Sequence, residues 1–146
     1  MVSQVDFYLS AGERPQSQPL LACRLAAKAF DHNLKSYILA SDKRQVRILD
    51  QLLWTYDDCS FIPHEALLTA DAPSTPCPVL IGSIDAEKTG FDVLISLCPD
   101  IPQHYQNYHR IADIIATDET SVALARKRFR YYREQGYSPN FHELKS

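Results

Sequence analysis

The chain has 146 residues, 45% of them hydrophobic and 23% charged, with a formal net charge of −3 at pH 7. This length and composition fit one soluble globular domain spanning residues 1–146. The pI near 5.9 argues against a general nucleic-acid coat, which would normally be basic. No apolar run is long enough to cross a membrane, and the N-terminus lacks the features of a signal peptide. We therefore expect a cytoplasmic protein.

The first part of the chain predicts alternating strands and helices. Residues 5–9 contain β-branched and aromatic side chains and predict a strand. A helix is expected over residues 19–32, with Pro19 in its first turn and Asn33 as a left-handed stop. The apolar run at 36–40 is typical of a buried parallel strand. A second helix is expected over residues 42–54.

The second part of the chain predicts more strands and one long helix. Residues 55–75 look irregular, and the histidine at position 64 is expected in a turn. Three further strands are predicted at residues 79–84, 92–97 and 109–116. The last helix is expected over residues 118–135, with Gly136 as its stop. The tail after it is expected to pack on the core through Tyr137, Phe141 and Leu144.

Strands joined by helical crossovers predict an α/β fold with a doubly wound, mainly parallel sheet flanked by helices in a single domain. Such a fold invites a search for nucleotide sites, but the four glycines form neither a dinucleotide-binding nor a P-loop motif. The four cysteines contain no Cys-x-x-Cys pair, and His104 and His109 do not have metal-ligand spacing. We expect no catalytic residue, no metal and no cofactor.

The last predicted helix carries an unusual concentration of positive charge. Five of the fifteen lysines and arginines lie within residues 126–133. Helical spacing gives an apolar stripe formed by Ala125, Phe129 and Tyr132, and beside it a basic stripe formed by Arg126, Arg130 and Arg133. Lys127 and Arg128 point elsewhere. The helix is either a solvated basic face or one side of an apolar groove suited to an acidic, hydrophobic peptide.

Residues 54–64 form a second candidate surface. They bring the single tryptophan, Trp54, together with Phe61, Pro63 and His64 near the end of a predicted helix. Trp54 and Phe61 either close the core or form an aromatic hot spot for a protein partner, because Trp is enriched at such positions. His64 could serve as a general base, but no nucleophile accompanies it.

Several stretches spread along the chain match one family in order and spacing. They are Asp6-Phe7-Tyr8-Leu9, Leu53-Trp54, Ser60-Phe61-Ile62-Pro63-His64, Asp92-Val93-Leu94-Ile95-Ser96-Leu97, and Leu124-Ala125-Arg126-Lys127-Arg128-Phe129-Arg130-Tyr131-Tyr132-Arg133 with Gly136. The chain resembles the chi subunit of the bacterial DNA polymerase III holoenzyme, an accessory protein of the clamp loader. The resemblance implies a doubly wound α/β fold without enzymatic activity.

The resemblance also implies two protein partners. The first is the C-terminal tail of the single-stranded DNA-binding protein, an acidic segment that ends in hydrophobic residues and a free carboxylate. The matching tail-binding positions are Arg126, Phe129, Arg130 and Arg133, with Ile115 and Val122 nearby. The second is the psi subunit, at Trp54, Phe61, Pro63 and His64, a surface that a helicase-like repair protein shares in some members. Val122 departs from the family pattern, which has a basic residue there.

The sequence is also compatible with two other functions. The basic helix and its aromatic side chains could bind single-stranded nucleic acid directly. An α/β sheet could also carry a nuclease-like active site assembled from distant residues. The resemblance favours a protein adaptor that makes no direct nucleic-acid contact.

Overall fold

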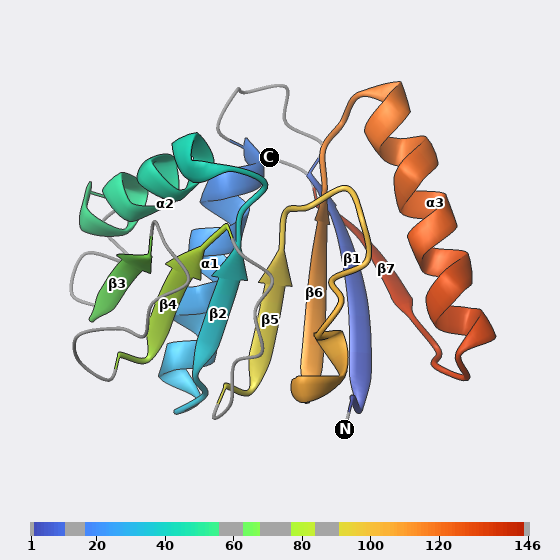
Figure 1. Cartoon of the computed structure of the whole chain (residues 1–146), viewed down its shortest axis with the longest axis horizontal. Coiled ribbons are helices and arrows are strands. Elements are labelled where there is room, and N and C mark those ends of the chain that lie inside the picture. Colours follow the sequence, from blue (N-terminus) through green and yellow to red (C-terminus); the bar gives the residue numbers. More distant parts are fainter. Residues whose placement is uncertain (1, 11–16, 56–62, 68–76, 84–90, 145–146) are drawn as a thin grey trace.

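The computed structural model describes residues 2–10, 17–55, 63–67, 77–83 and 91–144. Seven strands form one sheet in the order β3-β4-β2-β5-β6-β1-β7, and every pairing is parallel (Figure 1). The strands are β1 (Gln4–Ser10), β2 (Ser36–Leu39), β3 (His64–Leu67), β4 (Val79–Gly82), β5 (Val93–Ser96), β6 (Arg110–Ile115) and β7 (Asn140–Leu144). The expected doubly wound α/β fold is confirmed.

Helices cover both faces of the sheet (Figure 1). They are α1 (Ser17–Asp31), α2 (Lys43–Thr55) and α3 (Glu119–Glu134), with a short 3-10 helix, η1 (Tyr105–Asn107). Alternate residues of each strand face opposite layers. Ile38 and Ile95 pack with α1 and α2, whereas Tyr37 and Leu94 pack with α3 and η1. None of the helices in the described ranges has the length and hydropathy that a membrane crossing requires.

The ends of the predicted helices are confirmed by their caps. Asn33 has a φ of 60° just after α1, and Gly136 has a φ of 95° just after α3. The Asp118 carboxylate accepts a hydrogen bond from the Ser121 backbone N–H at 3.0 Å, which caps the N-terminus of α3. Interactions with the Ser121 side chain and then with its backbone N–H lower the pKa of Asp118. These caps fix where α3 starts and ends beside the sheet.

Two strands were not expected from the sequence. Residues 64–67, predicted to be irregular, form β3, so the prediction that His64 lies in a turn is wrong. The tail forms β7, which pairs with β1, and Phe141 is 53% exposed rather than packed on the core. Both are edge strands with one neighbour each, and their polar sequences lack the continuous apolar runs of the central strands.

A buried ion pair joins α3 to the sheet. The Arg128 Nε and Nη2 groups donate to the two carboxylate oxygens of Asp113 on β6, at 2.7 Å and 2.9 Å. Arg128 Nη1 also donates to the Pro99 carbonyl oxygen at 2.6 Å. Burial raises the pKa of Asp113, and the hydrogen bonds from Arg128 act in the opposite direction. Arg128 therefore points away from the basic stripe, as the helical spacing predicted, and orients α3 against β6.

Candidate functional site

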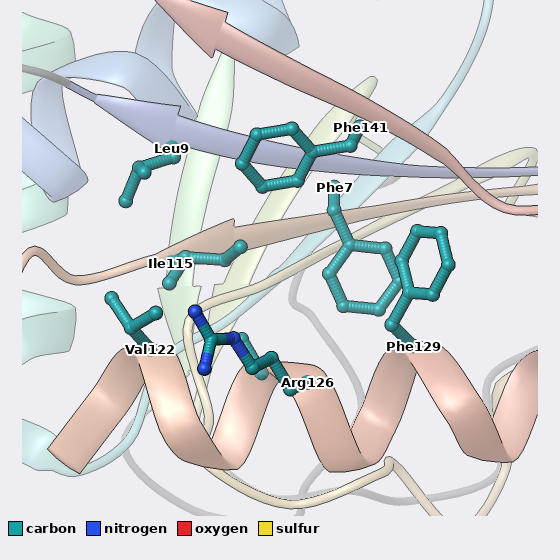
Figure 2. Close-up of a pocket in the computed structure, with 8 residues that line it drawn as sticks. Phe7, Leu9, Ile115, Val122, Arg126, Phe129 and Phe141 are labelled. Carbon is teal, nitrogen blue, oxygen red and sulfur yellow. The ribbon is translucent and has the colours of Figure 1, made fainter. Parts of the chain in front are cut away.

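An apolar cavity of about 370 Å³ lies between α3 and the edge of the sheet formed by β1 and β7. We call it the α3 groove. Its lining residues are Phe7, Leu9, Ile115, Val122, Ala125, Arg126, Phe129 and Phe141 (Figure 2). All of them except Arg126 have apolar side chains. The groove is therefore suited to an apolar group carrying one negative charge.

Helix α3 and strands β1, β6 and β7 build the α3 groove (Figure 2). Strands β1 and β6 form its floor, because Phe7 and Ile115 lie on the face of the sheet that packs with α3. Helix α3 forms one wall through residues spaced three and four apart, which share a helix face. Phe129 packs against Phe7 with the ring centroids 5.3 Å apart and the rings inclined at 55°. Phe141 on β7 lies across the groove from α3.

Arg126 supplies the positive charge of the α3 groove. Its guanidinium extends from α3 toward Ile115, between Val122 and Phe129 (Figure 2). Within the described part of the chain it makes no ion pair, unlike Arg128 two residues further on. A guanidinium presents paired N–H donors that match the two oxygens of a carboxylate. The groove can therefore bind a carboxylate beside an apolar side chain.

Four of the residues expected to bind the tail come together in the α3 groove. They are Ile115, Val122, Arg126 and Phe129. Arg130 and Arg133 are exposed on α3 and do not line the cavity. The apolar stripe is present as predicted, with Ala125 and Tyr132 buried and Phe129 half-buried.

Sequence reasoning missed three lining residues. Phe7 and Leu9 are two residues apart on β1, so the predicted strand places them on the same face. The strand pattern does not show which helix covers that face. Phe141 belongs to β7, a strand that the sequence did not predict. The apolar Phe141 between the polar Asn140 and His142 is a weak period-two pattern, and it is the sequence signal that could have indicated this strand.

The second candidate surface lies at the opposite edge of the sheet, where α2 ends and β3 begins. Trp54 is 62% exposed, so the alternative in which it closes the core is wrong. Its ring meets the His64 ring edge-on, with centroids 4.8 Å apart. The His64 side chain is only 1% exposed, and its Nε2 lies 3.2 Å from Asp50 Oδ1. Pro63 is exposed, and Phe61 lies outside the described residues.

Comparison with known proteins gives one consistent result. The model of a family described as DNA polymerase III chi subunit, HolC, matches residues 2–140. The DNA polymerase III subunit chi of Pseudomonas aeruginosa is 34% identical over 143 residues, covering 98% of each chain. The proteins of the same name from Haemophilus influenzae and Escherichia coli are each 28% identical to this chain. The Haemophilus influenzae match covers 94% of this chain and 95% of the relative. The Escherichia coli match covers 82% of this chain and 81% of the relative.

Proposed function

Because the chain belongs to the family of DNA polymerase III chi subunits, which are replication accessory subunits, we propose that it is a non-enzymatic adaptor. Its α3 groove binds the acidic C-terminal tail of the single-stranded DNA-binding protein. The surface around Trp54 binds the psi subunit, which links the protein to the clamp loader. A helicase-like repair protein is a further candidate for the Trp54 surface. The adaptor acts in the cytoplasm.

The observation that carries the tail proposal is the position of Arg126 inside an apolar cavity. A terminal apolar side chain packs against Phe129, Val122 and Ile115. The free carboxylate of the same residue then lies beside the guanidinium, where charge-assisted hydrogen bonds are stronger than neutral ones. A peptide with a free, apolar C-terminus meets both requirements with a single residue.

The exposed arginines of α3 supply long-range attraction. Arg130 and Arg133 lie outside the cavity, one and two turns along the helix from Arg126. They attract the acidic residues that precede the end of the tail and mainly affect the association rate. A peptide that buries only a few side chains should bind with a Kd on the order of micromolar, and more weakly at high salt.

The direct test compares two forms of one peptide, an acidic segment ending in phenylalanine, by fluorescence anisotropy. We expect the free-acid form to bind at micromolar concentration. The C-terminally amidated form should bind at least about tenfold more weakly, because hydrogen bonds to charged groups contribute about 1.5–3 kcal/mol. Equal affinity for the two forms would exclude a carboxylate site. Displacement of the peptide by a bare oligonucleotide would favour direct nucleic-acid binding instead.

The Trp54 surface gives a separate prediction for the psi subunit. Trp54→Ala should reduce recovery of psi in a pull-down and weaken its affinity at least about 30-fold, because tryptophan hot spots contribute about 2 kcal/mol or more. Phe141→Ala is the matched control, since it removes an exposed aromatic ring from the opposite edge of the sheet. If both variants recover psi equally well, the assignment of psi to this surface is wrong.

A further inference from the structure

The wall of the α3 groove opposite helix α3 is supplied by the edge strand β7. Phe141 pairs in register with Phe7 on β1, so both side chains lie on the face of the sheet that carries the groove. Together with Phe129, they place three phenyl rings around one cavity (Figure 2). Phe141 is 53% exposed, so its ring has surface available for a ligand.

The opposite face of β7 carries a polar cluster centred on Asp6. Asn140 Nδ2 donates to Asp6 Oδ1 at 3.2 Å, and His142 Nε2 lies 3.1 Å from the same oxygen. Gln4 Nε2 donates to the other oxygen at 2.7 Å. The His142 ring also stacks on Tyr8, with centroids 4.9 Å apart and planes inclined at 19°. Asp6 is 7% exposed although it carries a charge.

Two residues of this cluster lie on the strand that carries Phe141. Strand β7 has β1 as its one neighbour in the sheet, and edge strands fray more readily than central ones. Asn140 and His142 flank Phe141 and bond Asp6 from the face opposite the groove. Removing the Asp6 carboxylate would leave both side chains without this shared acceptor. These contacts link the strand that carries Phe141 to a residue that does not line the groove.

We propose that Phe141 makes the groove selective for an aromatic terminal side chain and that Asp6 is the residue that positions it. The inference rests on the proposed function of the groove. An aromatic ligand ring can meet the edges and faces of three phenyl rings, a preference that an aliphatic side chain cannot satisfy equally. Because Val122 adds no charge, selectivity comes from the shape and aromatic lining of the groove together with Arg126.

The test measures the affinity of two acidic peptides, one ending in phenylalanine and one in leucine, for wild type and variants. Phe141→Ala should weaken the phenylalanine peptide about tenfold and the leucine peptide about twofold at most, consistent with the energy of aromatic pairs. Asp6→Ala should reproduce this selective loss. Asp6→Asn should keep most of the wild-type affinity for the phenylalanine peptide, because the amide oxygen still accepts hydrogen bonds from Asn140 and His142.

Amide hydrogen exchange supplies a second readout that needs no peptide. In Asp6→Ala the Phe141 amide should exchange faster than in wild type, while amides of the central strand β5 remain protected. Asp100→Ala, which removes an exposed carboxylate elsewhere, is the control and should change neither exchange nor affinity.

Each part of the proposal has its own contradicting result. Equal weakening of both peptides by Phe141→Ala would overturn the selectivity. Unchanged Phe141 exchange in Asp6→Ala would overturn the positioning role. If wild type binds neither peptide, the proposed function and the selectivity both fail, and exchange alone decides whether Asp6 holds β7.

Discussion

Arg126→Ala should weaken binding of the acidic tail peptide about 10- to 100-fold, because hydrogen bonds to charged groups contribute about 1.5–3 kcal/mol. Among the described residues that line the α3 groove, Arg126 is the one with a charged side chain. Its removal leaves the apolar contacts with Phe129 and Val122 in place, so residual binding should persist. Isothermal titration calorimetry at fixed salt gives the affinity directly.

Two variants separate the role of Arg126 from a general effect of charge. Lys127→Ala removes one positive charge from the next residue, which is exposed and outside the groove, and should change the affinity by less than about threefold, as for a rim charge. Arg126→Lys keeps the charge but loses the planar pair of donors, and it should bind with intermediate affinity. Equal losses in Arg126→Ala and Lys127→Ala would show that only net charge matters.

Asp113→Ala should destabilise the fold by about 3–5 kcal/mol, because it leaves the buried Arg128 guanidinium without its carboxylate. For a chain of this size that loss corresponds to a fall in Tm of roughly 6–20 °C. Urea unfolding monitored by circular dichroism measures the change. The same variant should perturb the α3 groove, because Arg128 lies on α3 between Arg126 and Phe129.

The paired replacement Asp113→Leu with Arg128→Met is the informative control. Exchanging both members of a buried ion pair for apolar residues is often neutral or stabilising, so the double variant should recover most of the loss. A single-variant loss below about 1 kcal/mol, the value typical of exposed pairs, would contradict the buried character of the pair.

The buried pair also bears on the nucleic-acid alternative. Of the five basic residues in the cluster, Arg128 is buried and paired, which leaves Arg126, Lys127, Arg130 and Arg133 exposed. Arg126 lines an apolar cavity instead of adding to an open basic surface. The exposed charge is therefore smaller than the sequence indicates, which supports the proposed peptide ligand over a phosphate backbone.

The central fold was predictable because strands buried on both faces have continuous apolar sequences. Residues 79–82 and 93–96 are buried throughout, and both strands were expected. Edge strands β3 and β7 carry polar side chains and lack that signal. Their pairing with β4 and β1 depends on contacts between distant parts of the chain, which a local pattern does not contain.

The α3 half of the groove was predictable for a similar reason. Helical spacing places Phe129 and Arg126 on neighbouring stripes of α3 and directs Arg128 away from them, and the family resemblance added Val122. The opposite wall was not predictable, because Phe141 reaches the groove through the parallel pairing of β7 with β1. The Asp113 partner of Arg128 likewise depends on how α3 packs on β6.

An NMR titration with the free-acid tail peptide tests the central claim most directly. We expect the largest shifts at amides and methyl groups of the α3 groove, including Leu9, Ile115, Val122, Phe129 and Phe141. Residues around Trp54 at the other edge of the sheet should remain unchanged. Shifts concentrated around Trp54, or no shifts at millimolar peptide, would contradict the assignment of the α3 groove as the tail-binding site.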